Sequence, residues 1–167
     1  MATLPFLQWP HPCLATIASP VSEITGSIRD LWQDMVDSMD AMPGYGLAAP
    51  QIGVSLRLAV VDCSDTRGEA ILMANPEILH ASDKMRDYQE GSPNLPGMSA
   101  VISRPRAVTV RYMNALGRPE DRDFINLWAI SVQHQIDHLN GRMYFDRLSP
   151  LKRKMLLTKA NKQRRQA

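Results

Sequence analysis

Residues 126–141, NLWAISVQHQIDHLNG, place the strongest constraint on how this chain can fold. Apolar and histidine positions recur three and four residues apart, which is the spacing of an α-helix. Asn126 is a suitable N-cap for that helix, and Gly141 is a suitable residue for its end. One face of the helix is then shared by Leu127, Ile130, Ser131, His134 and His138. We therefore expect one central helix around which the other elements pack.

The middle of the chain reads mostly as antiparallel strands. Strands are expected over 56–63 and over 68–79, with a break in the second at Asn75-Pro76. Alternating apolar residues within 107–124, followed by turn residues, predict a hairpin. These segments and the central helix together predict an α+β fold.

The two ends of the chain have different signatures. Residues 1–24 contain four prolines, which predict an extended arm in place of regular structure. Thr25 can cap a helix that ends at Pro43, and Pro150 can begin a C-terminal helix. A chain of 167 residues is of ordinary size for one domain, so a single domain over 1–167 is expected.

Composition and cysteine placement bear on where such a protein works. Apolar residues make up 44% of the chain and charged residues 22%, values typical of a folded globular protein. We see no apolar run of about 18 residues and no basic leader with an apolar core, so no membrane association or secretion is expected. Cys13 and Cys63 have no closely spaced partners, which favours a reduced, cytoplasmic protein.

Charge is unevenly distributed along the chain. The net charge of +2 reflects 19 Lys and Arg against 17 Asp and Glu. Residues 151–167 hold seven of these bases and no acid, so residues 1–150 carry 12 bases against 17 acids, a net charge of −5. The basic segment can contact a polyanion such as ribosomal RNA. A solvated helix that keeps the protein soluble is the alternative.

His134 and His138 lie four residues apart, so both imidazoles can reach one metal ion. This spacing alone is weak evidence, because a histidine in a helix is more often a surface or core residue. Metallohydrolases of this spacing keep a glutamate, acting as general base, directly after the first histidine. Here that residue is Gln135, whose neutral amide cannot usefully accept a proton near pH 7.

Two further stretches accompany the histidine pair. Residues 44–53, GYGLAAPQIG, form a Gly-rich bend, and residues 88–97, YQEGSPNLPG, form a Pro- and Gly-rich stretch that reads as a loop. Taken together and in this order, the three stretches resemble the peptide deformylase motifs G-x-G-L-A-A-x-Q, E-G-C-L-S and H-E-x-D-H. The resemblance extends over nearly the whole chain, from HPCLATIASPV at 11–21 to FDRLSPLKRK at 145–154.

The resemblance implies an activity and a set of residue roles. This family removes the formyl group from nascent N-formylmethionyl chains with a ferrous or zinc ion. By resemblance, His134 and His138 hold the metal, and Ser92 stands at the third ligand position. Gln51 would donate to the oxyanion, and Gln135 stands at the base position. The peptide backbone and its methionine side chain would be held by Gly44, Tyr45, Gly46, Leu47, Leu127 and Ile130.

Three positions depart from the family pattern. Ser92 replaces the cysteine, and a neutral hydroxyl is a poorer metal ligand than a thiolate. Gln135 replaces the glutamate. Pro93 has no N–H, whereas the backbone N–H at that position is thought to help stabilise the oxyanion in this family. These departures predict either no metal or weakly bound Fe²⁺ or Zn²⁺, with lost or strongly reduced deformylation. Asp137 matches the pattern and is expected to orient a ligand imidazole.

Three functions remain open. The departures favour a peptide-binding protein that holds formyl-Met peptides or nascent chains without turnover and contacts the ribosome through residues 151–167. The second function is an active metal-dependent deformylase or hydrolase with altered chemistry, in which Ser92 serves as a ligand or a nucleophile. The third is an interaction protein unrelated to formylated peptides. Metal content after purification separates the second from the other two.

Overall fold

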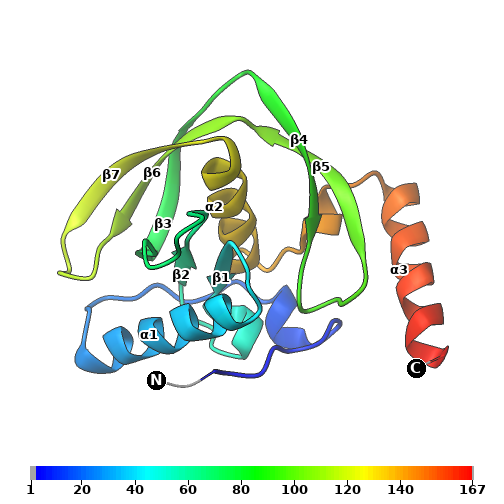
Figure 1. Cartoon of the computed structure of the whole chain (residues 1–167), viewed down its shortest axis with the longest axis horizontal. Coiled ribbons are helices and arrows are strands. Elements are labelled where there is room, and N and C mark those ends of the chain that lie inside the picture. The colour runs from blue at the N-terminus through cyan, green and yellow to red at the C-terminus, as the bar shows by residue number, and fades with distance from the viewer. Residues whose placement is uncertain (1–2, 167) are drawn as a thin grey trace.

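Helix α2 (Asn126–Leu139) runs through the middle of the molecule in the computed structural model, which describes residues 3–166. Every residue from Ala129 to Leu139 is buried. A helix buried on all sides needs a covering layer on each face. Figure 1 shows these layers: a sheet on one side of α2, a long β-hairpin on the other, and helix α1 beneath.

The larger sheet has five strands in the order β1-β2-β3-β6-β7. All neighbouring strands are antiparallel. Its inner face packs on α2 through a cluster that includes Val61, Val110 and Phe124 from the strands and Val132 from the helix. The strands are β1 (Gly46–Ala48), β2 (Leu58–Val61), β3 (Ile71–Ala81), β6 (Ala107–Met113) and β7 (Pro119–Ile125).

Strands β4 (Met85–Gly91) and β5 (Ser99–Pro105) form a second, two-stranded antiparallel sheet. The prediction that 88–97 is a loop was therefore wrong for 88–91, and the loop proper begins at Ser92. Glu90 and Arg104 are charged but buried, and they occupy inward-facing positions of these strands. Alternation of apolar and polar residues, by which a strand is predicted, expects apolar residues at such positions. The polar character of Glu90 and Arg104 hid the strand alternation.

Helix α1 (Gly26–Ala41) has the predicted N-cap, Thr25, whose Oγ1 accepts a hydrogen bond from the N–H of Ile28. Its Trp32, Met35 and Met39 are fully buried against the sheet. Over residues 3–24 the N-terminal arm is irregular apart from the short 3-10 helix η1 (Pro12–Ala15) and an isolated bridge between Ser19 and Leu56. A second such helix, η2 (Ala49–Ile52), follows β1.

Helix α3 (Pro150–Gln166) follows the 3-10 helix η3 (Tyr144–Arg147) and begins at the predicted residue. It lies beyond the β4-β5 hairpin, at the far side of the molecule from β7 (Figure 1). Its buried Ala160 packs with Leu95 and Phe145 in a cluster separate from the core around α2. Most of the remaining α3 side chains are exposed.

Two local predictions need correction. Asn126 does not cap α2, because it is the first helical residue, with φ of 55°, and the N-cap is Ile125. Its Oδ1 instead accepts a hydrogen bond from Nε of Arg106 at 3.2 Å. The expected break at Asn75-Pro76 is an irregularity within one continuous strand, β3, where the register with β6 shifts. The Asn75 side chain bonds the backbone of Val21 there.

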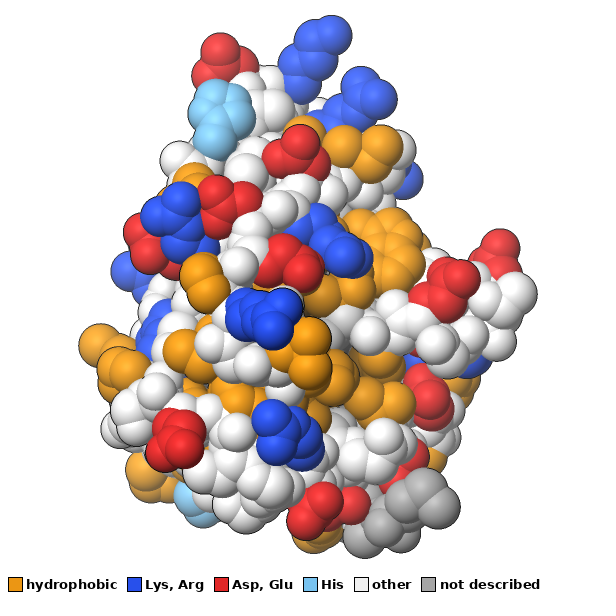
Figure 2. Space-filling model, turned by 90° about the vertical axis from the view of Figure 1, so that its left-hand side faces the viewer, with side chains coloured by type: hydrophobic (Ala, Val, Ile, Leu, Met, Phe, Trp, Pro, Cys, Tyr) orange, Lys and Arg blue, Asp and Glu red, His pale blue; other side chains and the backbone are white. Residues whose placement is uncertain are grey.

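The surface and the two cysteines bear on the expectations drawn from composition. On the face shown in Figure 2, acidic and basic side chains are interspersed around hydrophobic ones. Within residues 3–166, no helix combines the length and apolar character needed to cross a membrane. Cys13 and Cys63 are both free thiols.

Candidate active and peptide-binding site

An open cleft of about 280 Å³ lies where three segments meet. The first runs from Met42 past β1, the second is the end of β4 with its following loop, and the third is α2. Gly46 lies so close to α2 that a Cβ there would be 2.5 Å from Nε2 of Gln135 and 2.6 Å from Oγ of Ser131. Only glycine permits this approach of β1 to the helix.

Most of the predicted site residues line this cleft. They are Gly44, Tyr45, Gly46, Gln51, Ser92, Leu127, Ile130, His134 and Gln135. Leu47 is not among the lining residues, because its fully buried side chain packs in the core with α1. Adjacent residues in β1 point to opposite faces, so Gly46 and Leu47 cannot both face the cleft.

The two predicted metal-binding histidines face each other. Nε2 of His134 lies 3.0 Å from Nε2 of His138. Nδ1 of His134 lies 2.8 Å from Oε1 of Glu90, which as a carboxylate can only accept, so this nitrogen carries the proton. Burial lowers the pKa of His138 well below its ordinary value, so its imidazole is neutral near pH 7.

A buried ion network lies behind the histidines. Arg104, only 1% exposed, donates to both oxygens of Glu90 at 2.7 and 3.0 Å and to Asp137 at 2.8 Å. Arg147 donates twice to Asp137, at 2.7 Å each. Asp137 is therefore held by two guanidinium groups and not by the predicted ligand imidazole; the carboxylate that bonds His134 is that of Glu90. Arg104 lies outside the three motifs, so nothing in the sequence identified it as a site residue.

These contacts set the charge of the two carboxyl groups. Burial by itself would raise the pKa of Glu90, but the hydrogen bonds from His134 and Arg104 outweigh it and lower that pKa. Burial likewise opposes ionisation of Asp137, while Arg147 and Arg104 lower its pKa below the ordinary value. Both groups are therefore carboxylates near neutral pH.

Ser92 is buried and already engaged. Its Oγ donates to Oδ1 of Asn94 at 2.9 Å. The following residue, Pro93, lines the cleft without an N–H to offer. Ser92 is thus a neutral hydroxyl in a hydrogen bond with an amide, at the position where the family pattern has a cysteine.

Asn94 is a site residue that the sequence analysis missed. It is fully buried, and its Oδ1 also accepts from Nε2 of Gln51 at 2.7 Å. Its Nδ2 donates to the carbonyl oxygens of Leu7 and Gln51, and its own carbonyl accepts from the N–H of Trp9. The sequence could have identified it, because Asn94 stands where the family pattern E-G-C-L-S ends in serine and is therefore a fourth departure from that pattern.

Gln135 lies in the cleft wall with only 4% of its surface exposed. Its Oε1 is buried and has no hydrogen-bond partner among the described residues. Tyr88, another lining residue that the sequence analysis did not select, comes from β4. Burial raises the pKa of Tyr88, so its hydroxyl is protonated near pH 7.

The residues present fit only part of a three-ligand metal site. His134 and His138 present facing Nε2 atoms, as two ligands of one divalent ion would. The third position supplies the Ser92 hydroxyl, which is neutral and donates to Asn94. No cluster of three or more His, Cys, Asp or Glu suited to a metal occurs within residues 3–166. The donor set therefore does not fit the Cys-His-His site that the family pattern implies.

A helix that carries two facing imidazoles, one of which, His134, lines an open cleft, is typical of a small metallohydrolase. The family model for polypeptide deformylase matches residues 3–154. The chain belongs to the peptide deformylase family.

Individual relatives agree with this assignment over the full length. The chain is 40% identical to a peptide deformylase of Azotobacter vinelandii over 166 residues, covering 99% of both chains. It is 42% identical to peptide deformylase 2 of Xanthomonas axonopodis pv. citri over 168 residues, covering 99% of this chain and 98% of the relative.

Solved structures show the same fold. A peptide deformylase from Legionella pneumophila superposes with a TM-score of 0.91 at 40% identity, covering 98% of this chain and 96% of that one. A peptide deformylase from Ehrlichia chaffeensis in complex with actinonin superposes with a TM-score of 0.90 at 31% identity, covering 98% of both chains. The expected α+β deformylase-like fold is confirmed.

Proposed function

We propose that this protein binds N-formylmethionyl peptides in its cleft and removes the formyl group far more slowly than a family member with cysteine and glutamate at positions 92 and 135. The observation that carries the proposal is the state of Ser92, whose buried hydroxyl donates to Asn94. A hydroxyl in this state supplies no negative charge to a metal.

Two further residues add to the impairment. A general base contributes roughly 10²–10⁴ to a rate, and Gln135 cannot act as one. One oxyanion donor contributes about 10²–10³, and Pro93 lacks the N–H that would donate. Such effects do not multiply cleanly, but at their low ends they amount to about 10⁴ together.

The alternative is an active metal-dependent deformylase that works with Ser92 and Gln135 in place. The relatives favour this alternative, because proteins about 40% identical over nearly the whole chain are themselves peptide deformylases. Their names state deformylation of peptides. The residues at 92, 93 and 135 favour impaired deformylation, and an activity assay distinguishes the two functions.

The test measures binding and turnover on one preparation. Calorimetric titration with formyl-Met-Ala-Ser gives the affinity, and release of formate under anaerobic conditions with added Fe²⁺ gives the rate. The positive control is the same chain carrying Ser92→Cys, Pro93→Leu, Asn94→Ser and Gln135→Glu. We expect binding by both proteins and turnover at least about 10³-fold slower in the unchanged chain. Equal turnover by the two proteins contradicts impairment, and absence of binding contradicts the proposed function.

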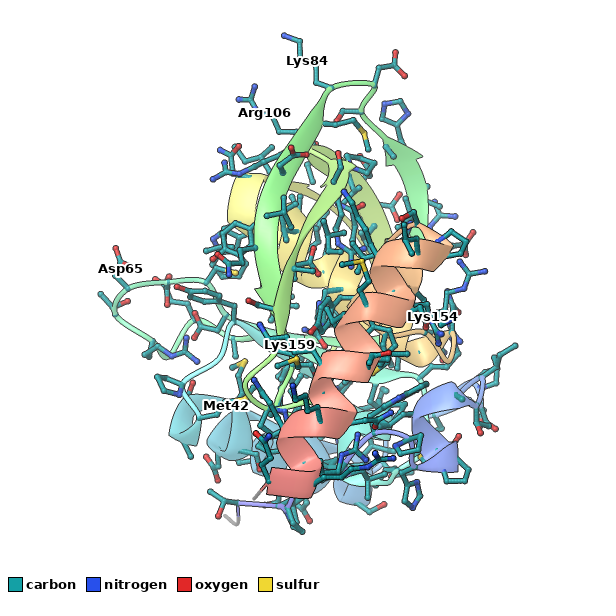
Figure 3. The ribbon with its side chains drawn as sticks, turned by 90° about the vertical axis from the view of Figure 1, so that its right-hand side faces the viewer. Met42, Asp65, Lys84, Arg106, Lys154 and Lys159 are labelled. Carbon is teal, nitrogen blue, oxygen red and sulfur yellow. The ribbon has the colours of Figure 1, made fainter. Side chains whose placement is uncertain are left out.

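We also propose that the basic helix α3 contacts ribosomal RNA and thereby brings the cleft near nascent chains. Lys154 and Lys159 lie on α3 (Figure 3), whereas the described residues that line the cleft come from other segments. A peptide in the cleft and an RNA on α3 therefore occupy different parts of the surface. Phosphate contacts by several lysines and arginines give an affinity that falls steeply with salt.

A further inference from the structure

Two tyrosines line the outer part of the cleft. Tyr45 comes from the segment that leads into β1, and Tyr88 comes from β4. Tyr45 is 47% exposed, so a bound molecule can reach its ring. The same cleft is lined by Ser92, His134 and Gln135, which are only 8%, 9% and 4% exposed. The cleft is therefore open beside Tyr45 and closed beside the histidine.

Both tyrosines stand on a fixed backbone. The carbonyl oxygen of Tyr45 accepts hydrogen bonds from the N–H of Asp62 and from Oγ of Ser131, each at 2.9 Å. Tyr88 lies within β4, where it pairs with Ile102 of β5. A binding group whose backbone is already ordered loses less conformational freedom when a ligand arrives, and this favours binding.

The two phenol groups act on each other. Burial and, to a smaller degree, the neighbouring Tyr45 raise the pKa of Tyr88, so the Tyr88 hydroxyl is protonated near pH 7. The influence of Tyr45 on that pKa also means that the two side chains lie near each other in the cleft. Aromatic rings attract a further ring in edge-to-face or offset geometry, beyond the effect of buried area alone.

A peptide that enters this cleft end first has to leave it past the tyrosines. Its formyl group and methionine side chain would occupy the closed part, beside His134 and Ile130, which are almost fully buried. The residues that follow methionine continue through the open part, where Tyr45 is exposed. Side chains of these following residues therefore come within reach of the two rings.

We propose that Tyr45 and Tyr88 form an aromatic clamp on the side chain of the second or third peptide residue, so that the cleft prefers formyl-Met peptides with an aromatic residue there. The inference rests on the proposed peptide-binding function and adds a sequence preference beyond methionine. An aromatic side chain gains ring contacts as well as burial, whereas an aliphatic side chain of similar size gains burial alone.

The test compares phenylalanine with leucine at each position by calorimetric titration. The four peptides are formyl-Met-Phe-Ser, formyl-Met-Leu-Ser, formyl-Met-Ala-Phe and formyl-Met-Ala-Leu, and mass spectrometry after each titration establishes that the formyl group is intact. At one of the two positions, we expect the phenylalanine peptide to bind at least about fivefold more tightly than the leucine peptide. Equal affinities at both positions overturn the inference and leave peptide binding standing. Absence of binding by all four peptides overturns the proposed function as well.

Four variants assign the preference to the two rings. Tyr45→Leu and Tyr88→Leu keep apolar bulk but remove a ring, and each should reduce the ratio of the two affinities to about twofold or less. Tyr45→Phe and Tyr88→Phe keep the ring and should keep the ratio. The matched control is Phe6→Leu, which removes a partly buried ring that packs with α1 residues outside the cleft.

The ratio of two affinities is the readout, because a general loss of binding affects both peptides alike. Thermal unfolding establishes that each variant is folded, and the two phenylalanine variants test the clamp even where a leucine variant does not fold. A ratio unchanged in both folded leucine variants overturns the assignment. Loss of the preference in the phenylalanine variants, or in Phe6→Leu, overturns it too, since a clamp made of these rings needs neither hydroxyl nor Phe6.

Discussion

The side-chain amide of Gln51 donates through Nε2 to Oδ1 of Asn94 at 2.7 Å. Gln51 is the residue that the family resemblance assigns to the oxyanion, so Asn94 takes up part of its donor capacity. The same Oδ1 accepts from Oγ of Ser92, and Asn94 also binds the N-terminal arm at Leu7 and Trp9. One buried asparagine thus holds two candidate catalytic positions and the arm in a single network.

Restoring activity should therefore require several changes at once. We expect Gln135→Glu alone and Ser92→Cys alone to give little formate release, because each leaves the other defect and the Asn94 bonds in place. The combination of both with Pro93→Leu and Asn94→Ser should give the largest gain. Formate release from formyl-Met-Ala-Ser measures each step. Strong turnover by Gln135→Glu alone would show that Ser92 and Pro93 are no obstacle.

The amount of bound metal should depend on which residue occupies position 92. The purified protein is expected to hold well under one equivalent of iron, nickel or zinc after dialysis against a chelator, because two imidazoles alone bind weakly. Ser92→Cys should raise the content towards one equivalent, since a thiolate completes the ligand set. Elemental analysis decides the matter, with Ser92→Ala as the control. Stoichiometric metal in the unchanged chain would show that the Ser92 site binds metal well.

Gly46→Ala should weaken peptide binding more than it affects stability. The new Cβ would lie within 2.6 Å of Gln135 and Ser131 and must displace the Gln135 amide from its position. We expect at least about a tenfold loss of affinity for formyl-Met-Ala-Ser in a calorimetric titration. Gly26→Ala is the matched control, because a Cβ there meets nothing within 4 Å. An unchanged affinity in Gly46→Ala would mean that Gln135 has room to move aside.

Removal of Arg104 should destabilise the fold in a pH-dependent way. Arg104 holds two buried carboxylates, and truncating one partner of such a network costs about 3–5 kcal/mol. The pKa values of Glu90 and Asp137 are lowered in the folded state, so the stability they contribute is present near pH 7 and is lost as the pH falls. In Arg104→Leu each carboxylate loses one of its charged partners, so protonation of the carboxyls at lower pH reduces the destabilisation.

Urea unfolding at pH 7 and pH 5 measures this effect. The difference between Arg104→Leu and the unchanged protein should be larger at pH 7 than at pH 5. Arg111→Leu is the control, because Arg111 forms an exposed ion pair with Asp121 and its loss should change stability little. A pH-independent difference would indicate lost packing as the cause.

Charge on α3 should control ribosome binding. Deleting residues 151–167 is a poor test, because Leu156, Leu157 and Ala160 pack on the cluster around Phe145 and their loss would expose it. Replacing exposed Lys154, Lys159 and Lys162 by glutamine keeps the helix and removes three charges. The resulting triple variant should lose co-sedimentation with ribosomes at low salt and retain binding of formyl-Met-Ala-Ser.

A second triple variant separates α3 from net charge. Lys84, Arg86 and Arg118 are exposed and lie outside α3, so their replacement by glutamine removes the same charge elsewhere. We expect this variant to co-sediment as the unchanged protein does. Co-sedimentation that is insensitive to salt between roughly 50 and 200 mM would contradict the proposed phosphate contacts. The basic residues of α3 would then serve solubility alone.

The sequence by itself determined the elements with strong local signals. Helix α2 follows from its spacing of apolar and histidine residues, helix α1 from the Thr25 cap, and the β6-β7 hairpin from its alternation and turn. Gly46 and Gln135 also stood out, because local motifs carry them. Such signals depend on neighbouring residues and need no knowledge of the rest of the fold.

Only the tertiary structure decided how distant residues combine. Asn94 contacts Gln51 and Leu7 across 43 and 87 residues of sequence, and Arg104 reaches Asp137 across 33. The direction of Leu47, away from the cleft and into the core, depends on how β1 faces α2. These polar contacts are buried, so losing one of them destabilises the fold more than losing a surface contact would. The reason is that a buried polar group has no water to bond and needs its partner within the protein.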